Sequence, residues 1–302
     1  MKKSSSILVI IVIFLISCNS GDKNAPDAQG PNVTKKMGKQ LNISILWDLS
    51  DRIKPEKGNL QPSNADRDIA IIKYFAEYFK TDMDKKGAFM SKGKLKVFFS
   101  PDPSDQNINT LAAKLDIDLE KKDVKIKKQI YDSISSDFEQ ISRQITSLTI
   151  KTSKWEGSDI YGFFKNSIDL CISKDTSYRN ILVLLTDGYL LHPNSKLTIK
   201  NRSEFITSSQ LTSLGLRTNK FKEVFDAKDC GLIAPRTDLN NLEILVLEVN
   251  PEINYKEIDE AVIKLYLKKW FSDMKVKHSE VYSTDLPINT AKRISEFLNI
   301  EQ

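Results

Sequence analysis

The sequence predicts an α/β fold with a Rossmann-like, doubly wound and mostly parallel sheet that helices cover on both faces. Three observations predict it. Apolar runs of strand length recur along the chain, most end abruptly at a polar or turn residue, and segments with helical spacing separate them. The chain has 302 residues, of which 40% are hydrophobic, so it can bury the core of one large domain. We expect residues 41–302 to form that domain.

Four runs that are apolar at most positions are the expected central strands. Such a composition is typical of strands that are buried on both faces of a parallel sheet. They are residues 41–47, 95–100, 181–186 and 242–249, and a weaker segment at 277–282 is expected to add the last strand.

Apolar residues at steps of three and four predict the helices between these strands. The segments with this spacing are residues 69–79, 126–148, 160–168, 258–270 and 288–297. Residues 189–241 interrupt the alternation, and we expect them to be a helical insertion. This insertion either shapes the choice of a partner or covers an edge of the sheet.

The first 18 residues have the pattern of a signal peptide. Lys2 and Lys3 precede an apolar run at 7–16, which is too short for a stable membrane-spanning helix. The sequence Leu15-Ile16-Ser17-Cys18 resembles a bacterial lipobox. This resemblance implies that Cys18 becomes the first mature residue and carries a diacylglyceryl thioether and an N-acyl chain such as palmitate. An uncleaved N-terminal membrane anchor is the alternative.

Residues 19–40 are expected to be a flexible tether, because they are rich in small, polar and turn-forming residues and almost lack large apolar side chains. Asn19 follows the lipobox where an aspartate would indicate retention in the inner membrane. We therefore expect an extracytoplasmic location in the cell envelope, with the outer membrane favoured. The formal net charge is only +5 and both signs are interspersed, so no nucleic-acid partner is expected.

Three polar loops are the candidate site. Asp48 and Asp187 each end an apolar strand, and alternation places Ser50 on the same side of the chain as Asp48. In open parallel sheets, ligands bind outside the carboxyl ends of the strands. Ser158 begins a helical pattern, where it serves as a helix N-cap or as a hydroxyl ligand.

These loops resemble the metal-ion-dependent adhesion site of the von Willebrand factor A domain. That family has Asp-x-Ser-x-Ser after the first strand, a Thr at the start of a later helix, and Thr-Asp-Gly after the fourth strand. Asp48, Ser50 and Asp187 match this pattern, and Ser158 replaces the Thr. The resemblance implies a divalent cation, Mg²⁺, Mn²⁺ or Ca²⁺, whose open coordination position accepts an acidic side chain of a protein partner. It implies a binding module and no enzyme.

One position departs from the pattern, because Arg52 replaces the second Ser. Its guanidinium either swings outward and leaves the coordination to water, or pairs with Asp48 or Asp51 and replaces the metal. Asp51 is interpreted as a turn residue or an acceptor beside the metal ligands. Asp159 either steadies the metal loop or favours the start of its helix electrostatically.

Two other functions fit the same residues. The first is a metal-assisted hydrolase in which Asp48 and Asp187 bind the metal and Ser50 is the nucleophile. It requires a positioned base, and neither of the two histidines has a spacing that indicates one. The second is an envelope scaffold whose metal site has degenerated.

Overall fold

The computed structural model describes residues 38–54, 62–152, 157–251 and 253–300. The expected signal peptide with Cys18, and nearly all of the expected tether, lie outside these ranges. Residues Met37–Gln302 form one compact unit. This unit contains every described strand and helix and both apolar cores, which are the properties of a domain that can fold alone. None of the described helices is long and apolar enough to cross a membrane.

A six-stranded sheet in the order β3-β2-β1-β4-β8-β9 is the centre of the fold. All neighbours pair in parallel except β3, which runs antiparallel to β2 at one edge. This confirms the expected mostly parallel sheet. The strands are β1 (Gln40–Trp47), β2 (Lys94–Phe98), β3 (Asp116–Asp118), β4 (Tyr178–Leu185), β8 (Leu242–Val249) and β9 (His278–Ser283).

The strand order reverses direction between β1 and β4. The chain adds β2 and β3 on one side of β1, and then β4, β8 and β9 on the other. β1 and β4 pair in register from Gln40 and Tyr178 to Trp47 and Leu185. Their carboxyl ends therefore flank a topological switch point, which is where open α/β sheets bind ligands.

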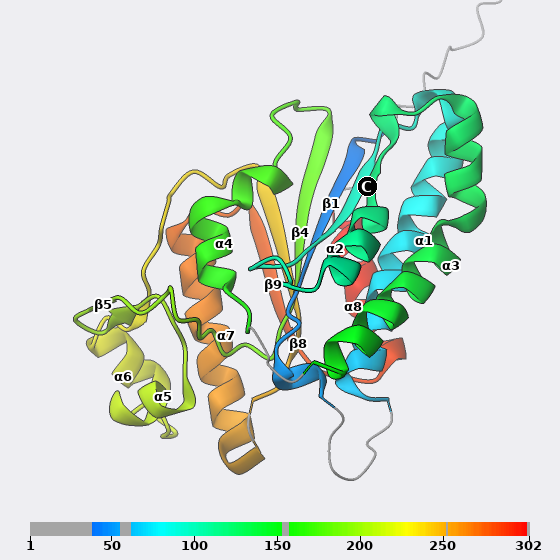
Figure 1. Ribbon diagram of the computed structural model, residues 1–302. Helices are drawn as coiled ribbons and strands as arrows, with labels where there is room; N and C mark the ends of the chain where they lie inside the picture. Colours follow the sequence, from blue (N-terminus) through cyan, green and yellow to red (C-terminus); the bar gives the residue numbers. More distant parts are fainter. Residues whose placement is uncertain (1–37, 55–61, 153–156, 252, 301–302) are drawn as a thin grey trace, which may run out of the picture. The chain divides into compact units, whose positions relative to one another are not determined.

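Helices cover both faces of the sheet (Figure 1). One face carries α1 (Asn64–Met90), α3 (Val124–Ile150) and α8 (Pro287–Asn299), and the other carries α4 (Ile160–Asn166) and α7 (Lys256–Asp273). The short helix α2 (Gln106–Ala112) precedes β3. Successive residues of β1 alternate between two apolar cores, because Ile45 and Trp47 face α1 whereas Leu46 faces α4.

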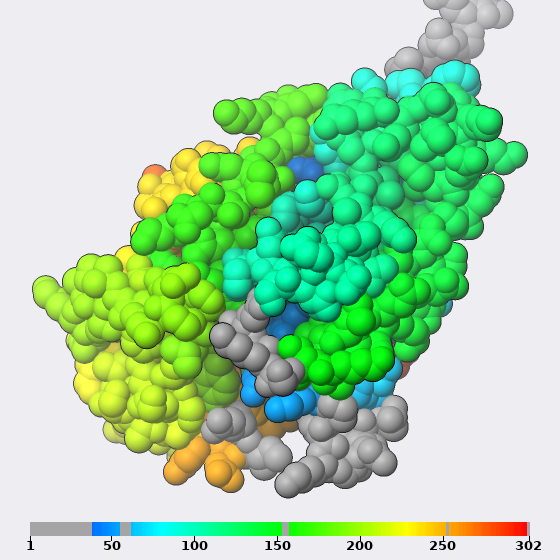
Figure 2. Space-filling view, in the orientation of Figure 1, coloured from blue at the N-terminus to red at the C-terminus, as the bar shows by residue number. Residues whose placement is uncertain are grey.

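Residues 189–241 form a lobe beside the α7 face (Figure 2). They contain the expected helical parts, α5 (Ser208–Ser213) and α6 (Phe221–Ala227). They also contain a small sheet of β5 (Thr198–Ile199), β6 (Arg202–Ser203) and β7 (Gly231–Leu232), which the sequence did not predict. Arg217 attaches this lobe to α7, because its guanidinium pairs with the buried carboxylate of Asp259 at 2.6 Å.

Candidate functional site at the switch point

Asp48 lies at the end of β1 and is almost completely buried, with 3% of its surface exposed. Its backbone N–H donates to the carbonyl of Leu185, which continues the β1–β4 ladder by one residue. One carboxylate oxygen accepts the backbone N–H of Ser50 at 2.8 Å, and the other accepts the hydroxyl of Thr186 at 3.3 Å. The loop after β1 and the end of β4 thus hold this carboxylate in place.

Asp187 follows Thr186 at the end of β4. Its Oδ1 accepts the backbone N–H of Tyr189 at 2.9 Å. Burial and the nearby charge of Asp48 raise the pKa of Asp187 to about 7, although Arg52 partly opposes this rise. The next residue must be glycine, because Gly188 has a φ of +96° and an added Cβ would lie 2.6 Å from the side chain of Ile263. A raised carboxyl pKa at a switch point is a mark of functional sites.

Ser50 precedes the short 3₁₀ helix η1 (Asp51–Ile53). Its hydroxyl makes no cap bond to that helix. Asp51 is exposed, and its carbonyl accepts the N–H of Lys54, which agrees with its interpretation as a turn residue. The hydrogen bond from Ser50 to Asp48, and the electrostatic effect of Asp48 on Asp187, show that these three predicted site residues lie near one another.

Arg52 pairs with Asp68 of α1, so both expectations for its guanidinium were wrong. Nη1 and Nη2 donate to the two oxygens of Asp68 at 2.6 and 2.9 Å, and Trp47 Nε1 donates to the same carboxylate at 2.8 Å. Arg52 is turned inward because this bidentate partner is fully buried beneath it. Burial alone would lower the pKa of Arg52, but Asp68, followed by Asp48, Asp187 and Glu248, raises it.

Ser158 is not the N-cap of α4, which corrects one of its two predicted roles. Asp159 caps the helix instead, because its Oδ1 accepts the N–H of Gly162 at 2.8 Å. The hydroxyl of Ser158 is buried and has no hydrogen-bond partner in the described part of the chain. Ser158 lines a cavity of about 240 Å³ together with Trp47 and Leu49, which are the two neighbours of Asp48. Within the described ranges, no hydrogen bond joins this hydroxyl to the other three candidates.

Both histidines contact residues other than Ser50. His192 Nδ1 lies 3.3 Å from Asp159 Oδ2, and the ring of His278 stacks on Phe297 with a centroid distance of 5.2 Å. Asp159 also accepts the hydroxyl of Ser195 at 2.7 Å. This carboxylate therefore fastens the insertion to the start of α4, and its position at the helix start agrees with one of the two roles that the sequence allowed.

The charged groups around Arg52 carry an excess of negative charge. Arg52 pairs with Asp68, and Arg67 pairs with Glu248 at 2.7 Å. Asp48 and Asp187 act on Arg52 electrostatically and have no cation of their own in this group. When every carboxyl is ionised, two negative charges remain uncompensated.

This donor set suits a hard divalent cation, since carboxylate and hydroxyl oxygens are the ligands that Mg²⁺, Mn²⁺ and Ca²⁺ prefer. A divalent ion would also neutralise the two remaining charges. The described residues contain no cluster of three or more His, Cys, Asp or Glu side chains that could hold a metal ion. Hydroxyls, water and a partner's carboxylate would therefore have to complete the coordination of the Asp48–Asp187 pair.

Comparison of the chain with protein-family models, with curated proteins and with solved structures gave no match in any of the three.

Two buried acids of this region were not predicted. Asp68 stands at the apolar positions of α1, four residues before Ile72 and seven before Phe75. Glu248 interrupts the otherwise apolar carboxyl half of β8. An acidic residue inside an apolar pattern indicates a buried partner, and this signal could have identified both.

Proposed function

We propose that the chain is a lipid-anchored, extracytoplasmic protein-binding module of the von Willebrand factor A type, which binds by a divalent cation and performs no turnover. The single observation that carries this proposal is the Asp48–Asp187 pair at the switch point, in which Asp48 is buried and Asp187 is partly buried. Desolvation, followed by the charge of Asp48, raises the pKa of Asp187 to about 7. A fold keeps an uncompensated pair of like charges when a ligand relieves it.

Asp48, Ser50 and Asp187 would hold the cation, with Ser158 as a further donor. The ion would supply an electrophilic position for an acidic side chain of the partner. Ser50 supports this assignment because its backbone N–H fixes Asp48 while its hydroxyl makes no cap bond. Asp51, as a turn residue, and Asp159, as a helix cap, would shape the loops of the site without binding the ion.

The arrangement of the sheet supports the presentation of this site to a partner. Gln40 begins β1, so the expected tether to the lipid on Cys18 joins the amino edge of the sheet. Asp48 follows the last residue of β1 and therefore lies at the opposite edge of the sheet. With the anchor attached at one edge, the other edge would be free to meet a partner.

Titration calorimetry of residues 37–302 with MgCl₂, MnCl₂ and CaCl₂ tests the cation. We expect binding heat for the wild type, and a loss of at least about tenfold in affinity for Asp48→Asn and Asp187→Asn. Asp132→Asn is the matched control, because it removes an exposed carboxylate on α3. Absence of binding heat and of a thermal shift with all three ions would reject the cation.

A scaffold with a degenerate site is the second candidate, and the inward position of Arg52 favours it. The guanidinium lies within electrostatic reach of both carboxylates and partly compensates them without a metal. The two candidates differ in capture of a partner from envelope extract. The adhesion module loses its partner when a chelator is added or when Asp187 becomes Ala, whereas the scaffold retains it under both conditions.

A further inference from the structure

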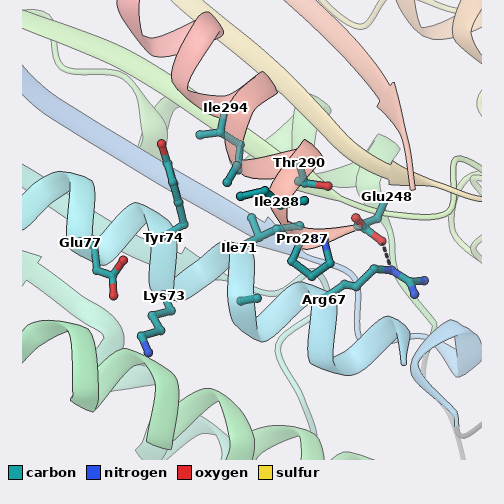
Figure 3. A pocket seen from close by; sticks show the side chains of 12 residues that line it. Arg67, Ile71, Lys73, Tyr74, Glu77, Glu248, Pro287, Ile288, Thr290 and Ile294 are labelled. Atoms are coloured by element: carbon teal, nitrogen blue, oxygen red, sulfur yellow. Dashed lines mark hydrogen bonds and ion pairs between the residues drawn. The ribbon is translucent and has the colours of Figure 1, made fainter. Parts of the chain in front are cut away.

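A cleft of about 370 Å³ lies between α1, the end of β8 and the first turns of α8 (Figure 3). Its walls are mainly apolar. They include Ala70 and Ile71 from α1, and Pro287, Ile288, Ala291 and Ile294 from α8. Ile288 is 74% exposed, so a molecule in the cleft would cover a large apolar side chain that now faces solvent.

Glu248 closes one end of the cleft, and the backbone is strained to place it there. Its φ is +70°, a left-handed conformation that is costly for a residue other than glycine. The strain occurs where the pairing of β8 with β9 shifts register between Val246 and Val249. The side chain is thereby buried, with 2% exposure, beside Arg67.

The hydrogen bonds of Glu248 use only one of its two oxygens. Oε2 accepts Arg67 Nε and the hydroxyl of Thr284, both at 2.7 Å. Oε1 is buried and has no partner among the described residues. A carboxylate oxygen that is withdrawn from water without a donor costs free energy, so this geometry suits a donor that the described residues do not provide.

A second buried oxygen without a described hydrogen-bond partner lines the same cleft. Thr290 is 3% exposed, and its hydroxyl has no partner in the described part of the chain, although its backbone N–H is bonded to Leu286. Figure 3 shows the hydroxyl of Thr290 and the carboxylate of Glu248 at the same end of the cleft. One ligand group with several N–H donors could satisfy both oxygens.

We propose that this cleft binds a small primary amine with an apolar body, whose ammonium group lies between Glu248 and Thr290. A carboxylate forms its strongest hydrogen bonds with a cationic donor. Arg67 cannot fill this role, because its guanidinium already donates to Glu248 Oε2, to the carbonyl of Pro62 and to Asn64. The apolar walls would hold the rest of the ligand.

The test is calorimetry of residues 37–302 with three probes of one shape, 4-phenylbutylamine, 4-phenylbutan-1-ol and 4-phenylbutyrate. EDTA is present throughout, so that the result is independent of the proposed cation site. We expect the amine to bind at least about tenfold more tightly than the alcohol, and the carboxylate to bind weakest. Equal binding of the three probes, preference for the carboxylate, or no binding of the amine would overturn the proposal.

Two variants test where the ammonium group lies. Glu248→Gln should weaken the binding of the amine by about tenfold or more. Thr290→Val should weaken it by about fivefold while folding at least as stably as the wild type, because it removes a buried hydroxyl without a partner. Glu77→Gln is the control, since Glu77 also lines the cleft. If Glu77→Gln abolishes binding and Thr290→Val leaves it unchanged, the assigned position of the ammonium is wrong.

Discussion

Asp187 shows how a single residue connects stability with the proposed function. Its pKa of about 7 in the fold exceeds the ordinary value of 3.8, because burial and Asp48 disfavour the charged form. At pH values between these two pKa values, the Asp187 carboxyl therefore holds a proton in the folded chain and has lost it in the unfolded chain. The contribution of this carboxyl to stability is complete below pH 3.8 and is lost as the pH rises through about 7.

Asp187→Asn removes this titration, which gives a prediction for the chain in EDTA. At pH 8 we expect the variant to be more stable than the wild type by about 1 kcal/mol or more, and the difference should shrink as the pH falls and nearly disappear at pH 3, below both pKa values. Urea unfolding at the two pH values measures it. Saturating Mg²⁺ should reverse the order at pH 8, because only the wild type gains the binding energy. A variant that is less stable than the wild type at pH 8 in EDTA would contradict the raised pKa.

At the residue scale, the sequence predicted the positions of Asp48 and Asp187 at the strand ends better than the surroundings of these residues. Asp48 and Asp187 could be located because each ends an apolar strand. The partner of Arg52 could not be inferred from the loop, since Asp68 lies 16 residues away on another element and meets Arg52 only when α1 packs on the sheet. Local spacing identifies a residue's type and position, whereas the choice between competing charged partners is made by tertiary packing.

At the scale of elements, the start of α4 depends on Asp159 and not on Ser158. Asp159→Ala should reduce stability by about 1 kcal/mol or more, because it removes the cap of Gly162 and the bonds to Ser195 and His192. Asp159→Asn should retain most of the cap. The free energy of unfolding of Ser158→Ala should lie within about 0.5 kcal/mol of the wild-type value or above it, since the Ser158 hydroxyl has no described partner. Urea unfolding in EDTA compares the three.

Long elements were predicted and short ones were not, and strand length is the reason. β4 and β8 each contain eight residues that are all buried, and such runs are visible in any sequence. β3 has three residues, two of them aspartates, and β5, β6 and β7 have two residues each. Segments of this length have no measurable period. Their pairing is set by the neighbours that they meet after the chain has folded.

At the scale of the whole molecule, the sheet places the start of β1 and the proposed site at opposite edges. β1 begins at Gln40 and ends beside Asp48. Its eight residues separate the two edges by about 23 Å at the usual rise of a strand. A tether of the length expected for residues 19–40 has a root-mean-square span of about 26 Å. The attached edge should therefore stay closer to the bilayer on average than the edge that carries Asp48 and Asp187.

This arrangement predicts different distances from the membrane for two exposed positions. Lys92 lies beside the start of β2 at the amino edge, and Asp51 lies at the carboxyl edge. A dye on Lys92→Cys should transfer more energy to acceptor-labelled lipids than the same dye on Asp51→Cys, in the full chain reconstituted in vesicles. Cys171 and Cys230 should remain unlabelled, because both are buried and burial raises the pKa of both thiols.

Cys18→Ser is the control, and in this background transfer should disappear for both dyes because the chain leaves the vesicles. Retention of the Cys18→Ser chain on the vesicles would contradict the lipid anchor. Stronger transfer from Asp51→Cys would retain the anchor and contradict the orientation, since the edge with the Asp48–Asp187 pair would then face the bilayer and not a partner outside it. The Cys18→Ser control therefore tests whether the chain is attached to the membrane, and the two dye positions test whether the site faces away from it. A binding module at the end of a tether requires both.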